Sequence, residues 1–448
     1  MKRKMMAVAL TMTMLIGLVG CGNKAENTAT NQPTATAEES QATDEKETAD
    51  PGQLEAKNLV WESWSSLEDS TKGVIDGLVS GYNGLGGSQV EVMGWPWAET
   101  QQQLIIRSQG SEQLDIAQVD IGMFGALAET GVLVDLNELL GKDYLAENYD
   151  EAALSVGNVD GQQLAMPWSI ASIGMVYNPT LLKAVGYNEP PKTIAEFEAC
   201  MKALKEYDPE IIPYGVSTKD ETMATDFQPW LWTFGGSLLD ESGNVSIDSD
   251  SAKNAVTWYK SLLDNEYIQM NITRADARTL FAQGKIAFYD DAISCNGVAV
   301  SNGVDKEKLD EFIKPMTRPV LKEGDTPQAA MWGHMLVVFK NSKAQEQAAD
   351  FIKYVVNEEN SINYLNSNGM LPVLKTAIDS NDVKENAWAS KWLGITANGK
   401  KLEFALYRNG GELNTTVVEE LQSVMVGDKK VEDALKDAQT RLSDYKEY

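Results

Sequence analysis

The chain is poor in the residues that build most metal and nucleophilic sites. It has one histidine, His334, and three cysteines, Cys21, Cys200 and Cys295. A zinc site needs several His or Cys ligands, and a Ser-His or Cys-His nucleophile needs a histidine beside it. No GxGxxG motif follows an expected strand, and there is no Walker A loop. We therefore expect no catalytic residue, no metal and no cofactor.

Positive charge is also scarce. The chain has 38 Lys and Arg residues against 66 Asp and Glu, which gives a net charge of −28. Nucleic-acid binding needs clustered Lys and Arg to neutralise phosphates. The composition therefore argues against a nucleic-acid partner, and the acidity is explained by solubility alone.

Long apolar runs are confined to the N-terminus. Lys2-Arg3-Lys4 precedes an apolar run from Met5 to Val19, which is too short to span a membrane comfortably and is typical of a signal peptide. The run ends in Leu18-Val19-Gly20-Cys21, which resembles a bacterial lipobox. That resemblance implies a leader over residues 1–20 and a Cys21 that is acylated, for instance with palmitate. The alternative is an ordinary signal peptide followed by a stray cysteine.

Aromatic residues are missing from Gly22 to Ala56, where small and polar residues dominate. Such a segment cannot bury enough apolar surface to fold. We interpret residues 21–56 as a lipidated cysteine and a disordered tether. The body would then be exported and anchored to the outer face of the bacterial cytoplasmic membrane.

The first part of the body alternates strands and helices. Expected strands lie at 59–61, 90–92 and 115–119, and expected helices at 74–82, 99–109 and 124–130. Strands separated by a helix form βαβ units with parallel pairing. The sequence therefore predicts an α/β fold.

The stretch from Gly161 to Phe197 marks a change of organisation. It holds an apolar strand at 164–166, a break at Pro167-Trp168, and a second strand at 173–177. Thr193 with Glu196 three residues later predicts a capping box. Helices follow at 194–207, 222–236, 251–265, 344–357 and 431–442, with strands at 286–288 and 335–339.

Seven segments in this order resemble one family. They are DIAQVDIGMFGALAETGVLVDL from Asp115, GQQLAMPWSIASIGMVYNPTLL from Gly161, PKTIAEF from Pro191, FAQGKIAFYDD from Phe281, WGHMLVVFKNSKAQEQAADFIKYVV from Trp332, NSNGMLPV from Asn366 and VEDALKDAQTRL from Val431. The chain is similar to the extracellular solute-binding proteins of ABC importers, in the sugar-binding group that includes the maltose-binding protein.

The resemblance implies a two-lobe periplasmic-binding-protein-like (type II) α/β fold with a three-crossing hinge. Lobe one would comprise 57–166 and 290–335, and lobe two 167–289 and 336–448. A monomer would capture a carbohydrate between the lobes, close by a hinge motion and deliver it to the permease subunits of an ABC importer. Because Cys200 and Cys295 fall in different lobes, we expect two buried free thiols, although export permits a disulfide.

Tryptophan is the main candidate for sugar contact, because an aromatic ring covers the C–H face of a sugar. Six Trp residues stand in loops or at strand ends and are expected to line the cleft: Trp64, Trp95, Trp97, Trp168, Trp230 and Trp332. Core packing is the alternative for each of them. Four others, Trp61, Trp258, Trp388 and Trp392, are assigned to the core.

Six polar residues are candidates for the sugar hydroxyls: Asp120, Gln228, Asp290, Asp291, His334 and Arg408. Asp120 follows a strand and resembles a cleft position of the family, with a solvated carboxylate as the alternative. One of Asp290 and Asp291 is expected to be an exposed acid. For Arg408 a surface ion pair is the competing explanation.

Two other functions stay open. The same fold would bind a polyamine, a peptide or a phosphorylated polyol if the cleft carried the matching charges. A glycosidase would need two opposed carboxylates such as Asp120 and Asp290. Ala171 stands four residues after Pro167, where the maltose-binding protein carries an acid, so maltose itself is in doubt.

Overall fold

The computed structural model describes residues 54–68, 71–110, 113–219, 222–407 and 409–445. The predicted leader, Cys21, the tether up to residue 53 and the candidate Arg408 lie outside these residues. Within the described ranges, no helix combines the length and the apolar character that a membrane span requires.

The N-terminal part of the body forms the predicted parallel βαβ units. Strand β1 (Asn58–Glu62) pairs in parallel with β2 (Gln89–Met93) and with β3 (Ile116–Asp120). Helix α1 (Lys72–Asn83) connects the first pair and buries Ile75, Leu78 and Tyr82, the stripe that its helical spacing predicts. Helix α2 (Trp97–Ser108) leads to β3, and α3 (Ile121–Glu129) begins directly after β3 ends. This arrangement brings the carboxyl ends of β1, β2 and β3 to one edge of the sheet.

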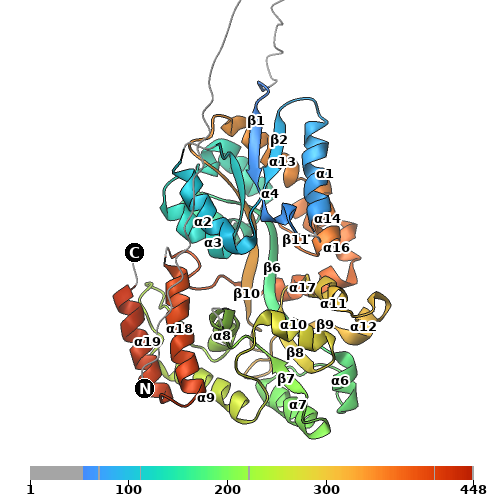
Figure 1. Cartoon of the computed structure of the whole chain (residues 1–448), viewed down its shortest axis with the longest axis vertical. Coiled ribbons are helices and arrows are strands. Elements are labelled where there is room, and N and C mark those ends of the chain that lie inside the picture. Colours follow the sequence, from blue (N-terminus) through green and yellow to red (C-terminus); the bar gives the residue numbers. More distant parts are fainter. Residues whose placement is uncertain (1–53, 69–70, 111–112, 220–221, 408, 446–448) are drawn as a thin grey trace, which may run out of the picture. The chain divides into compact units, whose positions relative to one another are not determined.

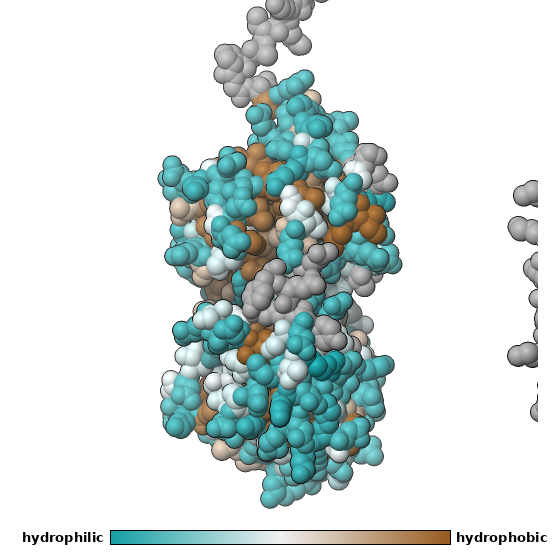
Figure 2. Space-filling view, turned by 90° about the vertical axis from the view of Figure 1, so that its left-hand side faces the viewer, coloured by the Kyte–Doolittle hydropathy of each residue, from teal (hydrophilic) through white to brown (hydrophobic). Residues whose placement is uncertain are grey.

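Two long antiparallel strands run from this upper body into a lower one (Figure 1). They are β6 (Met166–Tyr177) and β10 (Ala329–Val338), within a sheet ordered β2-β1-β3-β10-β6-β8-β7. β10 pairs with β3, while the second half of β6 pairs with β8 (Ile286–Asp291). Figure 2 shows the surface narrowing between the two bodies. The two-lobe α/β prediction agrees with this architecture.

The predicted break at Pro167-Trp168 is wrong, because β6 is one continuous strand. Its register against β10 shifts: Pro167 lies opposite Met335, and Ser169 lies opposite His334, so Trp168 is the extra residue of a β-bulge. A proline has no N–H to donate to a neighbouring strand and is tolerated in a sheet at such irregular positions.

The lower body is built mainly from helices around a short sheet. β7 (Ile212–Gly215) pairs in parallel with β8, and β9 (Lys314–Met316) pairs with β6. The predicted capping box is present at the start of α7, where the Thr193 hydroxyl accepts from the N–H of Glu196 and the Glu196 carboxylate accepts from the N–H of Thr193. The helices of this body include α6 (Pro179–Ala184), α7 (Ile194–Tyr207), α8 (Thr222–Thr233), α9 (Asp250–Asp264), α10 (Arg274–Ala282), α18 (Gly410–Met425) and α19 (Val431–Tyr445).

Strand pairing differs from the predicted lobe boundaries in two places. Met335–Val338 pair with β3, and α13 (Gln345–Val355) and α14 (Glu358–Asn368) pack on α1, so this segment joins the upper body. Residues 290–316 join the lower body instead, through β8, β9 and α12 (Leu309–Phe312). The reason is that β10 itself is a crossing strand, so the chain changes body along it. Since α18 packs on α8, the chain passes between the bodies a third time after α14.

The remaining elements each span 10 residues or fewer. They are η1 (Trp64–Ser66), η2 (Asn137–Gly141), α4 (Lys142–Asn148), α5 (Glu151–Leu154), η3 (Ser155–Gly157), β4 (Asn158–Val159), β5 (Gln162–Gln163), α11 (Cys295–Ser301), η4 (Lys306–Lys308), β11 (Leu371–Pro372), α15 (Lys375–Ile378), α16 (Asn381–Lys384), α17 (Ala387–Thr396) and β12 (Gly399–Lys400). Cys200 and Cys295 are both buried and free, which confirms that prediction.

Candidate functional site

The candidate site lies where the carboxyl end of β3 meets the crossing strand β10. Asp120, the last residue of β3, stands directly opposite His334 in the antiparallel register. Trp332 lies two residues before His334 and therefore on the same face of β10. The ring of Trp64, just past the end of β1, lies 5.2 Å from the His334 ring. Four residues chosen from the sequence are thus brought together.

Asp120 organises the aromatic side of this site. It caps α3, because its Oδ1 accepts a 2.8 Å hydrogen bond from the N–H of Met123. Its Oδ2 accepts another of 2.8 Å from Nε1 of Trp97. Burial raises the pKa of this carboxyl, while the N–H of Met123 and the indoles of Trp97 and Trp332 act in the opposite direction. Asp120 is therefore a buried carboxylate that holds two Trp side chains, and the alternative of a solvated carboxylate is wrong.

Trp97 is the solvent-facing member of the site, with 48% of its surface exposed. Trp332 and Trp95 are half-buried, and the guanidinium of Arg107 lies 4.6 Å from the centre of the Trp95 ring. Trp64, by contrast, is buried. The site therefore offers aromatic faces to solvent from α2, from the loop before it and from β10.

His334 is held as a neutral imidazole among aromatic rings. The centre of the Trp332 ring lies 4.9 Å away, and Nδ1 is 2.9 Å from the hydroxyl of Tyr364 on α14. Burial lowers the pKa of His334 to about 3, so the ring is uncharged at neutral pH. Nε2 is buried and has no hydrogen-bond partner among the described residues. A polar solute could supply one.

Glu62 is a site residue that the sequence analysis missed. It ends β1 and is fully buried, and no side chain among the described residues hydrogen-bonds to either carboxyl oxygen. Burial raises its pKa to about 8, and the backbone of Trp95 offsets only part of that rise. The available signal was an acid at the carboxyl end of an otherwise apolar strand.

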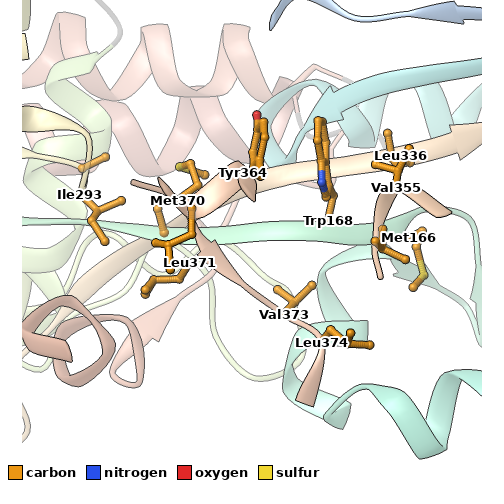
Figure 3. Close-up of a cluster of buried hydrophobic side chains, with 14 of the residues drawn as sticks. Met166, Trp168, Ile293, Leu336, Val355, Tyr364, Met370, Leu371, Val373 and Leu374 are labelled. Atoms are coloured by element: carbon orange, nitrogen blue, oxygen red, sulfur yellow. The ribbon is translucent and has the colours of Figure 1, made fainter. Parts of the chain in front are cut away.

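The sequence predicted that Trp168 would line the cleft wall of the second lobe, and this prediction is wrong. It is buried in the apolar core of the upper body, stacked on Tyr364 with ring centres 4.1 Å apart (Figure 3). Its ring also meets Trp61 edge-on at 5.9 Å. The β-bulge turns this side chain to the core side of β6, so Trp168 supports Tyr364 and, through it, His334.

Trp230, Asp290 and Asp291 belong to buried networks in the lower body. Trp230 donates a 2.9 Å hydrogen bond from Nε1 to the hydroxyl of Tyr214, and Asp290 forms a buried salt bridge with Arg318. Asp291 accepts bonds of 2.8 and 2.6 Å from Arg278. The expectation that one of the two acids is exposed is wrong, because both are buried and paired.

Gln228 lies on α8, which packs against β10. It is fully buried, and its Oε1 accepts a 3.1 Å bond from the N–H of Glu403 while Nε2 has no partner among the described residues. Trp232, one turn later, donates a 2.6 Å bond to the Glu403 carboxylate. The sequence analysis selected Gln228 but missed Glu403, to which both Gln228 and Trp232 are hydrogen-bonded.

Several buried polar atoms along the crossing strands share this lack of partners. The hydroxyls of Ser169 and Ser172 on β6 have none among the described residues, and Ser169 faces His334 across the strands. A cavity of about 10 Å³ lies here, lined in part by Ser169 and His334, and it has room for about one water. Within the described ranges no cluster of three His, Cys, Asp or Glu residues is placed to hold a metal ion.

Comparison with known proteins shows where this architecture recurs. The family model described as bacterial extracellular solute-binding protein matches residues 77–390. A binding protein of Brucella abortus (strain 2308) is 22% identical over 349 residues, which cover 77% of this chain and 82% of that protein. The diacetylchitobiose-binding protein DasA of Streptomyces coelicolor is 24% identical over 403 residues, with 87% and 86% covered.

A solved structure shares the fold. It is the GacH receptor of Streptomyces glaucescens, studied unliganded and in complex with acarbose. It aligns with a TM-score of 0.76 at 18% identity, over 88% of this chain and 100% of that one.

Proposed function

The chain belongs to the bacterial extracellular solute-binding proteins, and from that premise we propose that it captures a carbohydrate for an ABC importer. The solute would be bound between the two bodies, beside Asp120, Trp332 and His334. The permease subunits of the importer would then receive it. The sugar group suggested by the sequence motifs and the sugar named for DasA support this solute class.

The observation that carries the proposal is a row of buried polar atoms without partners next to aromatic rings. A buried polar group without a hydrogen bond costs about 1–3 kcal/mol, so a structure that keeps several is poised for a polar solute. Those on the crossing strands are Nε2 of His334 and the hydroxyls of Ser169 and Ser172. Sugar hydroxyls both donate and accept and would satisfy all of them, while Trp97 and Trp332 would cover the C–H faces.

The two strands that cross between the bodies would serve as the hinge. The cavity at Ser169 and His334 is far smaller than a sugar ring, so binding there requires the bodies to separate and close again. Hinge closure about a few strand and loop residues is an established kind of domain motion. The closed form is the one that the permease would recognise.

The other candidates have weaker support. A glycosidase that uses Asp120 and Asp290 would need both carboxylates free to act, but Asp290 is paired with Arg318 and hydrogen-bonded by Tyr214. A polyamine would need several unpaired acids, and Glu62 is protonated at neutral pH by its raised pKa. We therefore propose a non-catalytic, exported monomer that is anchored to the membrane through a lipid on Cys21.

A thermal-shift screen of the body from Lys57 onward tests the solute class. Mono- and oligosaccharides, polyamines and short peptides would be added one at a time, and a true ligand raises the melting temperature by mass action. We expect a saccharide to give the shift, with no turnover of that saccharide on prolonged incubation. A shift with polyamine or peptide alone would refute the carbohydrate proposal.

A further inference from the structure

A second pocket, of about 390 Å³, lies between the end of α8 and the segment that begins at the last residue of β12. Trp232, Gly235 and Gly236 line one side, and Lys400, Lys401 and Glu403 line the other. Its volume is in the range of small-molecule sites, which is roughly 300–1,000 Å³. Gly235 has a φ of +78°, a conformation that favours glycine, so no side chain covers this part of the wall.

The Trp232 ring is fixed in place and remains partly open to solvent. Its Nε1 donates to Oε1 of Glu403, and the other carboxyl oxygen accepts a 2.5 Å bond from the N–H of Leu239. Both oxygens of Glu403 are therefore used within the protein, and the half-buried indole presents a flat apolar surface. Such a surface suits the C–H face of a pyranose ring.

The two lysines give the pocket a positive charge in a strongly acidic chain. The ammonium of Lys400 lies 5.7 Å from the centre of the Trp232 ring, and Lys401 is half-buried, so that burial lowers its pKa. Neither forms a salt bridge with another described residue. Burial raises the pKa of the Glu403 carboxyl, so with both lysines charged the three side chains sum to at least +1.

We propose that this pocket binds the carboxylate-bearing ring of an acidic saccharide, a uronic acid, at one end of the captured solute. A uronate carries one negative charge, which is closer to the small positive charge of the pocket than the about −1.5 to −2 of a phosphate. The net charge of −28 acts at long range and is screened beyond about 8 Å at physiological ionic strength. The two nearby ammonium groups therefore decide the local preference.

Gln228 connects this pocket with the candidate site, so the inference rests on the proposed function. It precedes Trp232 by four residues, which places both on one face of α8, and its Oε1 binds the N–H of the same Glu403. Its buried Nε2 has no partner among the described residues. This amide is fully buried, so a saccharide that extends from the site into the pocket would reach it only once the bodies have separated.

Isothermal titration of the body from Lys57 tests the inference with matched probes. We would compare digalacturonate with the neutral disaccharide of the same linkage, and glucuronate with glucose and glucose 6-phosphate. We expect each uronate to bind at least tenfold more tightly than its neutral counterpart. In Lys400→Gln/Lys401→Gln this preference should fall to about twofold or less, while Lys401→Arg should keep it.

Lys391→Gln on α17 is the matched control, because this lysine is exposed and outside the pocket, and it should leave the preference unchanged. Melting temperatures would show that each variant folds, and Lys400→Gln alone keeps the test available if the double variant does not. If neutral saccharides bind as tightly as uronates, or glucose 6-phosphate binds best, the inference is wrong and the carbohydrate proposal survives. If no saccharide binds at all, both fall.

Discussion

Nε1 of Trp97 donates a 2.8 Å hydrogen bond to Oδ2 of Asp120, so a ring that is 48% exposed is tied to a carboxylate that is almost fully buried. The exposed ring is thereby held in one orientation before any solute arrives. Preorganised aromatic contacts of this kind give affinity at low entropic cost. Hydrogen bonds from the surrounding donors offset part of the cost of burying the carboxylate.

Trp97→Ala should weaken binding of the saccharide that raises the melting temperature by about tenfold or more. The loss comes from the missing C–H contact surface, since a binding hot spot costs more than ~1 kcal/mol when truncated. Stability should change by less than about 1 kcal/mol, because Asp120 keeps the Met123 and Trp332 donors. Isothermal titration and thermal melting measure the two effects separately.

Tyr207→Ala is the control for this change, because Tyr207 is an exposed aromatic residue at the end of α7. The affinity of the Tyr207→Ala variant for the saccharide should equal that of the unmodified protein. Trp97→Phe keeps a ring but loses the N–H, so its affinity for the saccharide should lie between those of Trp97→Ala and Tyr207→Ala. If Trp97→Ala binds as well as Tyr207→Ala, the solute does not contact this face.

Glu62→Gln should remove a pH dependence of stability. The pKa of Glu62 is about 8 in the folded protein against 4.5 ordinarily, so the folded state binds the proton more tightly than the unfolded state. Stability therefore falls as pH rises from about 4.5 to about 8 and is level above that. The total fall from this one group is on the order of 5 kcal/mol.

Urea unfolding at pH 5 and pH 8.5 measures this effect. Glu62→Gln should resemble the unmodified protein at pH 5 and exceed it by several kcal/mol at pH 8.5, because a neutral amide replaces the buried carboxylate. Glu91→Gln, an exposed acid on the neighbouring strand, should show no such gain. A gain of equal size at both pH values would mean that charge is not the cause.

The local features of the fold could be predicted from the sequence. The capping box at Thr193 and the helix over Ile194–Tyr207 depend on residues within a few positions of one another, and the structure confirms both. Parallel pairing of β1 with β2 and β3 followed from helices between strands. The resemblance implied a cleft position for Asp120, while its place opposite His334 on β10 was not predicted.

Features that depend on distant partners could not be predicted in this way. The bulge at Trp168 exists because β10, far along the chain, shifts register between His334 and Met335. Tyr364 was missed because only tertiary packing brings α14 to His334. For the same reason the sequence could not show that Arg318 neutralises Asp290.

The Trp168→Ala variant should be less stable than the unmodified protein, so it is not a test of the cleft. The ring is 1% exposed and stacked on Tyr364, so its removal leaves a core cavity that costs about 3–5 kcal/mol. Trp168→Phe keeps most of the stacking and should cost less. Thermal melting ranks the variants, and saccharide affinity of Trp168→Phe should stay within about threefold because the ring lies behind Tyr364.

The buried pair of Arg318 and Asp290 gives the last prediction. Arg318→Met leaves the Asp290 carboxylate buried without its cation and removes the guanidinium that lies 4.6 Å from the centre of the Trp230 ring. Breaking such a pair from one side costs about 3–5 kcal/mol, whereas replacing both members by neutral residues is often close to neutral. We expect Arg318→Met/Asp290→Asn to recover at least half of that loss in urea unfolding.

Arg107→Met, at the half-buried Trp95, is the matched control and should cost less than about 1 kcal/mol. If the double variant is as unstable as Arg318→Met, the loss arises from contacts of Arg318 other than the ion pair, such as its bond to the carbonyl of Gln328.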